Sequence, residues 1–379
     1  MNLVVLTGRY PSIDSPYSHM FVHTRSKQYI AQGHTVTALV PSEKEEQYTI
    51  DGVNVILGPV HKLIKYLANV DRVMIHLLLH RFTKAIDASV LYRYVLDHKL
   101  PTLFFIHGVE VQTIWNDRRD DISWLAPKSV ARWLYRDCYL IKKMQKTLAE
   151  FVESDIPAKF ITPSDWMLQE AINNTGVDLR QKSLVIANGI DTENFKFTER
   201  WADREKLLSI RPLNYRGKYA VDLVLETARR MPGNIQTALY GKGPDEDKIK
   251  SVISEQNLSD RLTLNSRFLQ PVEIPSVHQH AGIYLGVTRM DAQGVSMCEA
   301  MSSGLPTVSF STCAIPEFIE HNKTGLLAKP YDMDEYCSLV NELIENRELF
   351  EKIAWNAHQS MVAIDIRKTS EQELSAKLD

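Results

Sequence analysis

Short runs of apolar and β-branched residues recur along this chain, and stretches with helical character separate most of them. In the first half the runs lie at residues 3–7, 35–40, 53–57, 73–77, 102–106, 160–162 and 184–187. Several are apolar at every position, as strands buried on both faces of a parallel sheet must be. The second half restarts the rhythm, at residues 207–210, 235–240, 262–264, 283–287 and 307–311. Strands that alternate with helices predict an α/β protein with doubly wound parallel sheets.

The chain length fits this reading with two domains. Its 379 residues suggest two units at about 150 residues per domain. We therefore expect two Rossmann-like domains facing a central cleft, joined by the polar segment 191–203. The boundaries are placed at 1–195 and 196–355. Ligands of such sheets bind beyond the carboxyl ends of the strands, so the loops that follow strands are the places to search for chemistry.

Composition excludes several classes of function. The formal net charge of -3 argues against a protein that coats nucleic acid. Four scattered cysteines without metal-ligand spacing indicate a reducing, cytoplasmic compartment. No secretory signal is recognisable, and no apolar run approaches the roughly 18 residues of a membrane span. Gly8 stands alone after the first strand, and Gly241-Lys242-Gly243 lacks a third glycine. The dinucleotide and P-loop fingerprints are therefore missing.

A cationic loop follows the first strand of the second half. Arg211, Arg216 and Lys218 lie between that strand and a helix that we expect to begin near Val221. The positive charges and the helix dipole both favour an anion such as a diphosphate. The alternative is a solvated basic loop with no ligand.

A second anion site is predicted where the strand at 283–287 leads into the next helix. Gly294 permits close backbone approach, and Val295 and Ser296 offer free amides at the helix start. Asp291 precedes this helix and Glu299 lies just over one turn into it. Two carboxylates beside a phosphate cradle suit the hydroxyls of a sugar and a ribose. The alternative makes Asp291 a helix cap and Glu299 a surface residue.

The order of these motifs resembles that of the retaining glycosyltransferases of family 4, in the glycosyl transferases group 1, which have the GT-B fold. Arg211 and Lys218 stand where the family places the Arg and Lys that hold the donor diphosphate. Asp291 and Glu299, with seven residues between them, match its Glu-(seven residues)-Glu signature. Other matching segments are 187–191 with Phe195, 299–301, 304–306, 315–319 and 324–327. The resemblance covers nearly the whole chain and is most specific from 209 to 327.

The resemblance implies a transferase that moves a sugar from a nucleotide sugar to an acceptor hydroxyl with retention of configuration. Arg211 and Lys218 would stabilise the leaving diphosphate together with the amides of residues 294–296. Glu299 would bind the donor ribose, and Asp291 would hold hydroxyls of the transferred sugar. The family generally needs no metal or other cofactor. Its last helix, here 356–379, usually crosses back to the first domain.

The first domain supplies the remaining candidates. His107, after the strand at 102–106, resembles the family histidine that contacts the transferred sugar, and Glu110 would orient it, touch the acceptor or cap a helix. The paired glycines that the family has after its first strand are missing, which puts the acceptor geometry in doubt. Tyr17, His19 and Arg25 are candidate acceptor contacts there, and ordinary loop or helix-surface positions are the alternative.

One further feature is independent of the family. On a helical wheel of residues 128–152, the basic residues fall within about 120° of arc. They are Lys128, Arg132, Arg136, Lys142, Lys143 and Lys146. Tyrosines lie among them and tryptophans lie nearby, which suits the inner face of an anionic membrane or a phosphate-bearing lipid acceptor. The alternative is a helix packed on the sheet with a solvated charged face. Asp137 falls in the apolar arc, where it is either paired or marks a break in the helix.

Three hypotheses of function follow. The chain is a retaining glycosyltransferase that builds a cell-surface glycan or glycolipid, a non-catalytic GT-B subunit that binds a nucleotide sugar or supports a partner, or another GT-B enzyme such as an epimerase or a phosphorylase. The altered first loop and Asp291 in place of glutamate support the second hypothesis, and intact Arg211, Lys218 and Glu299 oppose it. The nucleotide base, the sugar, the acceptor, the linkage and the oligomeric state leave no clear trace in the sequence.

Overall fold

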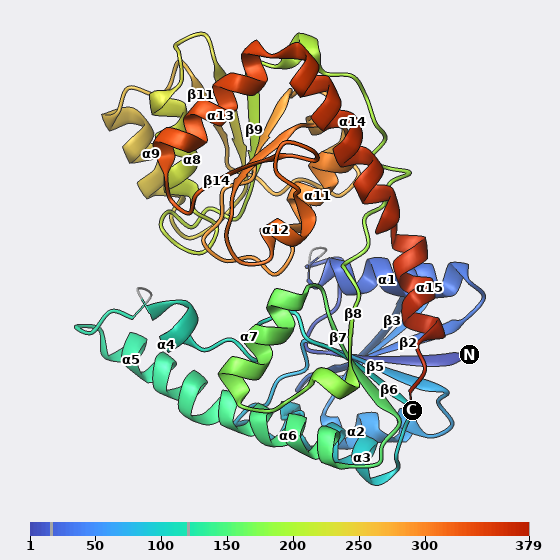
Figure 1. Ribbon diagram of the computed structural model, residues 1–379. Helices are drawn as coiled ribbons and strands as arrows, with labels where there is room; N and C mark the ends of the chain where they lie inside the picture. The colour runs from blue at the N-terminus through green and yellow to red at the C-terminus, as the bar shows by residue number, and fades with distance from the viewer. Residues whose placement is uncertain (16–17, 120–121, 379) are drawn as a thin grey trace. The chain divides into compact units, whose positions relative to one another are not determined.

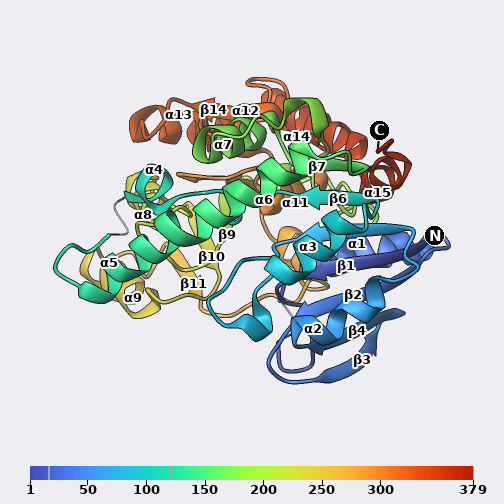
Figure 2. The same ribbon diagram turned by 90° about the horizontal axis from the view of Figure 1, so that it is seen from below.

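The computed structural model describes residues 1–15, 18–119 and 122–378, and the chain divides into two compact units. The N-terminal unit holds residues 1–187 together with 366–379, and the C-terminal unit holds 188–365. The sequence placed these boundaries at 195 and 355. The chain therefore leaves the first unit earlier and returns to it later than we expected. Figures 1 and 2 show the two units.

An eight-stranded sheet forms the centre of the N-terminal unit, in the order β3-β4-β2-β1-β5-β6-β7-β8. Its strands are β1 Asn2–Thr7, β2 Thr35–Pro41, β3 Glu46–Ile50, β4 Val53–Gly58, β5 Arg72–His76, β6 Thr102–Phe105, β7 Ala158–Thr162 and β8 Ser183–Val185. All neighbouring pairs are parallel except β3 with β4. The strand order reverses between β1 and β5, so the loops after these two strands open a switch point where ligands of such sheets bind.

The sequence missed β3, and the physical reason is visible. The strand reads Glu-Gln-Tyr-Thr-Ile and is exposed or half-buried throughout, because it lies at the edge of the sheet. It lacks the continuous apolar run of the buried strands. The turn to β4 passes through Asp51 and Gly52, both at positive φ, as a tight antiparallel hairpin requires. Figure 2 shows β3 beyond β4 at this edge.

Helices cover both faces of this sheet. They are α1 Met20–Ala31, α2 Val60–Leu63, α3 Ser89–Asp97, α4 Ile114–Asp117, α5 Pro127–Leu134, α6 Ile141–Glu153, α7 Asp165–Thr175 and α15 Ile366–Ser375, with short 3-10 turns at Ile64–Leu67, Lys84–Ile86 and Arg180–Lys182. In Figure 1, α1 and α15 lie side by side on one face, and α2, α3 and α6 lie on the other. Alternate residues of β1 divide accordingly, and Leu3 and Val5 join the core beneath α1 and α15.

The predicted basic helix 128–152 forms in three pieces. A π-helical turn, Tyr135–Leu140, joins α5 to α6 without an interruption of helical backbone. Asp137 lies in this turn, and its carboxylate accepts hydrogen bonds from the amides of Ile114 and Trp115 at 2.8 and 2.9 Å. Asp137 is therefore paired, because it caps α4. It does not mark a break, because the helical backbone continues through the π-helical turn.

The C-terminal unit contains a six-stranded parallel sheet in the order β11-β10-β9-β12-β13-β14. Its strands are β9 Lys206–Ile210, β10 Gln236–Tyr240, β11 Leu262–Asn265, β12 Ile283–Leu285, β13 Thr307–Phe310 and β14 Leu326–Ala328. In chain order this is 3-2-1-4-5-6, the arrangement of a dinucleotide-binding Rossmann fold, and the switch point lies between β9 and β12. The short β14 at the sheet edge was not predicted.

Two helical layers complete this unit. The helices are α8 Val221–Arg230, α9 Glu246–Glu255, α10 Ile274–His278, α11 Val295–Ser302, α12 Ile315–Phe318, α13 Met333–Glu345 and α14 Arg347–Ala363, with a 3-10 turn at Trp201–Asp203. One buried core joins α8, α9 and α13 to the sheet, and a second joins α11 to the later part of α14. The described residues contain no helix with the length and apolar character of a membrane span.

The last two helices belong to different units. We expected the crossing near Trp355, but α14 stays with the C-terminal unit, where its end is fixed by a β-bridge between Ile190 and Asp365. Only α15 belongs to the N-terminal unit. Its Glu373, fully buried, accepts hydrogen bonds from Arg25 at 2.9 Å and from the Tyr29 hydroxyl at 2.5 Å. A buried charge with two such partners fixes the position of α15 on α1.

Candidate functional site

Arg211 lies directly after β9, at the switch point of the C-terminal sheet. The residue is only 6% exposed, and its Nε donates a hydrogen bond to the Ser209 hydroxyl at 3.1 Å. The Ser209 hydroxyl donates in turn to the carbonyl of Leu285 at 3.1 Å, at the end of β12. Among the described residues, no carboxylate forms an ion pair with Arg211. A buried guanidinium without a counter-ion is costly unless an anion completes the site.

Glycines allow the neighbouring loop to support Arg211. A side chain at Gly241 would place its Cβ 1.8 Å from the Arg211 carbonyl, and one at Gly243 would lie 2.3 Å from the Leu213 carbonyl. The loop after β10 can therefore press directly against the backbone of the loop after β9. The Gly241-Lys242-Gly243 segment, which fails as a dinucleotide fingerprint, has this packing role instead.

Lys218 ends the cationic loop at the start of α8. Its carbonyl accepts hydrogen bonds from the Arg289 amide at 2.8 Å and the Thr288 hydroxyl at 3.0 Å. The loop is closed further by Asn214, whose Oδ1 accepts from the Gly217 amide at 2.9 Å. The ammonium of Lys218 has no ion pair with any residue that the structure describes and lies 4.7 Å from the ring centre of Tyr219. The backbone is thus held firmly while the charge is left available.

Arg289 behaves differently from Arg211 and Lys218. It forms two hydrogen bonds of 2.7 Å with the two carboxylate oxygens of Asp222 in α8. This bidentate pair neutralises Arg289 and ties the loop after β12 to the first turn of α8. Sequence analysis missed both residues. A basic residue after the β12 strand and an acid in the first turn of α8 were the available signals.

The start of α11 has the geometry that the sequence predicted. Gly294 is the residue before the helix, with φ of 77°, and no side chain caps the first turn. The amides of Val295 and Ser296 therefore remain available to an anion. The Ser296 hydroxyl is used differently, because it accepts a hydrogen bond from the buried Tyr284 hydroxyl at 3.0 Å. Of the three expected amides, that of Gly294 is already bonded to a protein group.

Asp291 supplies that group. Its Oδ1 accepts hydrogen bonds from the amides of Gln293 at 3.2 Å and Gly294 at 2.7 Å. The predicted alternative of a helix cap is wrong, because these two amides precede the helix and no side chain caps its first turn. Its Oδ2 makes no hydrogen bond to any of the described residues, so one oxygen remains for a substrate hydroxyl.

Gln293 was not singled out from the sequence, although it holds this loop in place. The side chain is 1% exposed, and its amide group pairs with the backbone of Asn188 in both directions. Nε2 donates to the Asn188 carbonyl at 2.8 Å, and Oε1 accepts from the Asn188 amide at 2.7 Å. The segment that enters the C-terminal unit is thereby fixed to the loop before α11. A glutamine between a small residue and a glycine gave no distinctive signal.

Glu299 lies in the second turn of α11. Burial of its carboxylate, reinforced by the charge of Asp191, raises the pKa of Glu299 to about 8. A neutral carboxyl can donate and accept a hydrogen bond, whereas the ionised form only accepts. Glu299 is half-buried, so the surface-residue alternative describes it only in part.

The N-terminal unit gathers histidines at the carboxyl ends of β1, β5 and β6. His107 follows β6, and its Nε2 lies 3.0 Å from Nδ1 of His76. The ring of Phe21 meets His107 edge-on at 4.9 Å. Burial, followed by the charges of Arg25 and His19, holds the pKa of His107 well below its usual range. The imidazole is therefore neutral at physiological pH and can serve as a hydrogen-bond donor.

Glu110 does not reach the His107 ring through any hydrogen bond recorded for the described residues. Its carboxylate is 2% exposed and accepts from the amides of Leu77 at 3.1 Å and His107 at 3.1 Å. Burial raises the pKa of Glu110 to about 7, against the opposing effect of these backbone hydrogen bonds. The residue orients His107 through its backbone. Contact with an acceptor stays a prediction.

The three other acceptor candidates are Tyr17, His19 and Arg25, and the structure gives each a different outcome. His19 has φ of 51° and its Nδ1 lies 3.0 Å from the Thr7 hydroxyl, while burial lowers its pKa to about 4. Arg25 is 4% exposed and faces Glu373 and the ring of Phe105. Tyr17 lies outside the described residues. His19 therefore lies with His76 and His107 at the carboxyl ends of the strands. Arg25 instead packs against α15.

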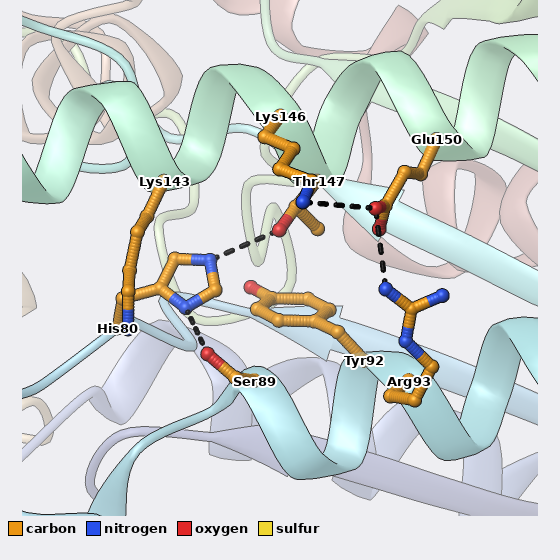
Figure 3. A pocket seen from close by; sticks show the side chains of 8 residues that line it. All are labelled: His80, Ser89, Tyr92, Arg93, Lys143, Lys146, Thr147 and Glu150. Carbon is orange, nitrogen blue, oxygen red and sulfur yellow. Dashed lines mark hydrogen bonds and ion pairs between the residues drawn. The ribbon is translucent and has the colours of Figure 1, made fainter.

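A cavity of about 240 Å³ lies between α3 and α6 in the same unit (Figure 3). It is lined by His80, Ser89, Tyr92, Arg93, Lys143, Lys146, Thr147 and Glu150. His80 bridges its two walls, with Nδ1 3.0 Å from the Ser89 hydroxyl and Nε2 3.0 Å from that of Thr147. Arg93 donates to Glu150 at 3.2 Å. Tyr92 and Lys143 bond outside the lining, to the Leu78 carbonyl and to Asp87. Of the lining residues, Lys143 and Lys146 had been named from the sequence, as part of the basic helix face.

Two Rossmann-like parallel-sheet units define a protein of the GT-B fold class. The solved structures that share the fold include Anabaena Alr3699/HepE in complex with UDP and glucose, with a TM-score of 0.71 at 15% identity, covering 98% of both chains. They also include a sucrose-phosphate synthase from Thermosynechococcus elongatus, with a TM-score of 0.72 at 13% identity over 98% of this chain and 97% of that one. Residues 191–360 match the family model of the glycosyl transferases group 1.

Curated relatives align with part of the chain. A poly(ribitol-phosphate) alpha-N-acetylglucosaminyltransferase of Staphylococcus aureus is 26% identical over 146 residues, which cover 38% of this chain and 29% of the relative. The amylovoran biosynthesis glycosyltransferase AmsK of Erwinia amylovora is 29% identical over 172 residues, 43% of this chain and 42% of the relative. The chain thus spans well under half the length of these relatives.

Proposed function

We propose that the chain is a retaining glycosyltransferase of family 4 that moves a sugar from a nucleotide sugar to a hydroxyl of a glycan or a lipid-linked acceptor. The observation that carries the proposal is the pair of cations at the switch point of the C-terminal sheet. Neither Arg211 nor Lys218 has a carboxylate partner among the described residues, whereas nearby Arg289 is fully paired. An uncapped helix start at Val295 adds to the positive potential. A diphosphate fits this arrangement.

The proposed chemistry is mainly positioning and electrostatic stabilisation. As the bond between the sugar and the diphosphate breaks, negative charge grows on the leaving group, where Arg211 and Lys218 attract it most strongly. Because these cations supply the charge, no metal ion is needed. Glu299 binds the donor ribose, Oδ2 of Asp291 holds a sugar hydroxyl, and His107 donates a hydrogen bond to the transferred sugar. No protein nucleophile is required.

Names of similar proteins support the substrate class. Alr3699/HepE was solved with UDP and glucose. The Staphylococcus relative is named for a polymer of ribitol phosphate and the Erwinia relative for amylovoran biosynthesis. A role in cell-surface polysaccharide or glycoconjugate synthesis follows from these names as part of the proposal.

The decisive experiment combines binding and turnover. Thermal unfolding is measured with UDP, GDP and their sugar derivatives, in the presence of a chelator, because a ligand that binds only the folded state raises the midpoint. Lys218→Ala should abolish the shift and lower turnover by about 100-fold, as loss of a group that stabilises developing charge does. Lys352→Ala, an exposed lysine of α14, is the control. Retention is read from the anomeric proton signals of the product.

Two outcomes would contradict the proposal. Binding without turnover of any nucleotide sugar would favour the non-catalytic subunit. Wild-type turnover in Lys218→Ala would refute the site assignment.

We also propose that the N-terminal unit contacts the inner face of the cytoplasmic membrane through the region of α4 and α5. Three tryptophan rings cluster there, with centres 5.4 to 6.2 Å apart, at Trp115, Trp124 and Trp133. Trp124 is 58% exposed and the adjacent Leu125 is 97% exposed. No residue of α5 is buried. Tryptophan is the side chain that prefers the boundary between headgroups and acyl chains.

The charges of this region suit an anionic surface, although fewer cations are available than the sequence suggested. Arg136 donates to backbone carbonyls of Gln112 and Val109, and Lys143 pairs with Asp87 at 3.3 Å. Lys128 and Arg132 are exposed and have no ion pair with any described residue. The part of the protein proposed to contact the membrane therefore consists of the tryptophan cluster, Lys128 and Arg132.

Co-sedimentation with phosphatidylcholine vesicles, with and without phosphatidylglycerol, tests the membrane proposal. Lys128→Glu with Arg132→Glu should remove the gain that the anionic lipid gives, at about 1 kcal/mol for each lost positive charge. Lys329→Glu with Lys352→Glu changes the charge equally on the C-terminal unit and should leave binding unchanged. Trp124→Ala with Leu125→Ala should weaken binding to both lipids. Equal binding by all variants, or none by the wild type, would refute the proposal.

A further inference from the structure

His76 is a buried histidine at the end of β5 whose role the proposed reaction leaves open. The residue is fully buried, and its ring stacks on Phe105 with centres 3.9 Å apart. Its Nδ1 lies 3.0 Å from Nε2 of His107. Its Nε2 is buried and has no hydrogen-bond partner among the described residues. The two rings thus share one short contact, while the other ring nitrogen of His76 has no hydrogen-bond partner among the described residues.

A single proton must lie between Nδ1 of His76 and Nε2 of His107. At 3.0 Å, two bare nitrogens would repel and two N–H groups would clash, so one ring donates and the other accepts. If His107 donated from Nε2, a neutral His76 would carry its own proton on Nε2. That N–H would then be buried without an acceptor. If His76 donates from Nδ1, its Nε2 is an unprotonated nitrogen, and His76 has no buried N–H group without an acceptor.

The second arrangement is favoured. Buried N–H groups without a partner are rarer in proteins than acceptors that are left incomplete. The neutral state of both rings agrees with it, because burial holds the pKa of His76 and that of His107 well below their usual range. With Nε2 accepting from His76, His107 carries its proton on Nδ1.

We propose that His76 is a positioning residue that donates its Nδ1–H to Nε2 of His107 and thereby fixes His107 as a hydrogen-bond donor through Nδ1–H. Nδ1 of His107 makes no hydrogen bond within the described part of the chain. His107 is half-buried, and its Nδ1 is not one of the fully buried polar atoms that lack a partner among the described residues. The donor is therefore accessible to a ligand. The inference rests on the proposed function only in naming that ligand, an oxygen of the transferred sugar.

This assignment also excludes a general-base role for His107 at the accessible nitrogen. Nδ1 already carries a proton, and the lone pair of Nε2 is occupied by His76. His107 consequently recognises an acceptor oxygen and does not remove a proton from a hydroxyl. The distinction concerns the direction of one hydrogen bond, which can be measured without turnover.

Nitrogen spectroscopy of the full-length chain provides the first test. Long-range ¹H–¹⁵N correlation on protein labelled at histidine separates protonated from bare ring nitrogens, and His107→Asn and His76→Asn variants assign the two rings. We expect Nδ1–H on both His76 and His107 in the wild type. Protonation of His107 on Nε2 would overturn the proposal.

Two substitutions test the positioning role. His76→Asn keeps an N–H donor near the position of Nδ1, whereas His76→Phe keeps the stacking on Phe105 and removes the donor. We expect His76→Phe to shift His107 toward the Nε2–H tautomer and to lower kcat about 10-fold at unchanged donor-nucleotide affinity, because the competent tautomer loses population. His76→Asn should retain the wild-type tautomer and most of kcat. Unchanged kcat in His76→Phe with a shifted tautomer would overturn the link to the reaction.

Failure of the proposed function would be distinguishable from failure of this inference. In that case no nucleotide sugar would turn over with the wild type, while the tautomer of His107 would still be read from the nitrogen spectrum. A variant that does not fold leaves the wild-type spectrum as the decisive measurement.

Discussion

Arg289 and Asp222 are joined by two hydrogen bonds of 2.7 Å, and this pair connects the loop after β12 to the first turn of α8. The backbone amide of Arg289 also donates to the Lys218 carbonyl at 2.8 Å. Arg289 therefore holds the end of the cationic loop that leads into α8, through its side chain at Asp222 and through its backbone at Lys218. The unpaired charge of Lys218 depends on this paired neighbour for its position.

Asp222→Asn is expected to loosen that loop. The variant removes the charge and one acceptor oxygen, while Arg289 keeps its guanidinium and loses the bidentate partner. Because both side chains are partly buried, we expect a loss of about 1–2 kcal/mol in the free energy of unfolding. The affinity for the nucleoside diphosphate should fall several-fold. Urea unfolding and calorimetric titration measure the two effects. Asp334→Asn, a change at an acid that is 93% exposed, is the control.

Glu299 should make nucleotide binding depend on pH. Its pKa of about 8 in the empty protein means that the carboxyl is largely protonated at neutral pH. Hydroxyl donors of a ribose stabilise the ionised form, so binding lowers the pKa and releases a proton. Affinity should then rise by roughly 10-fold from pH 6 to pH 8.5. Titrations in buffers of different ionisation enthalpy detect the released proton. Glu299→Gln should bind with no such dependence, and equal pH profiles for the two proteins would contradict the proposed role.

The same group affects stability in a defined direction. Its pKa is raised from 4.5 to about 8 by folding, so the native state retains a proton that the unfolded state has released. The free energy of unfolding must therefore fall as pH rises from about 4.5 to 8. Glu299→Gln should gain stability relative to the wild type over this window, by at least ~1 kcal/mol at its upper end. Thermal melts of the two proteins at several pH values check the sign.

Substitution of Gln293 is expected to change stability alone. Gln293→Ala leaves both the amide and the carbonyl of Asn188 without their present partner in a partly buried place. The expected loss is about 1–2 kcal/mol, since two partly buried backbone groups each lose a hydrogen bond. Gln293→Glu is the more discriminating variant, because its carboxylate can still accept from the Asn188 amide but meets the carbonyl with a negative charge. It should be no more stable than the alanine variant. Chemical denaturation of the three proteins checks this order.

Much of the fold was readable in the sequence because buried parallel strands are apolar at consecutive positions. The helix start expected at Val295 agrees with the structure, where α11 begins at that residue. The strand β3 was missed because an exposed edge strand needs no such pattern. The site was readable only in part. Arg211 and Lys218 could be found from charge beside a helix start. Gln293 could not, because its function lies in hydrogen bonds to a backbone segment about 100 residues away in the sequence.

Of the two histidines in contact, only His107 could be found from the sequence. His107 could be singled out because it follows a strand. His76 ends a strand that looks wholly apolar apart from Arg72, and its contact with His107 depends on the pairing of β5 with β6. Arg25 was predicted as an acceptor contact because it follows the first loop. Its real neighbour, Glu373, lies 348 residues away, and no local pattern announces such a partner.

That pairing gives the last prediction. Arg25 and Glu373 are 4% and 0% exposed, so Glu373→Gln leaves a buried guanidinium without its counter-ion. The expected cost is about 3–5 kcal/mol, which is typical when one member of a buried ion pair is removed. Arg25→Met with Glu373→Met should recover much of the loss, since both charges then disappear together. If Arg25 also contacted an acceptor, the double variant would regain stability and still show a raised acceptor KM. If the double variant recovers both its stability and the wild-type acceptor KM, Arg25 serves only to attach α15. If the double variant is no more stable than Glu373→Gln, Arg25 and Glu373 are not energetically coupled.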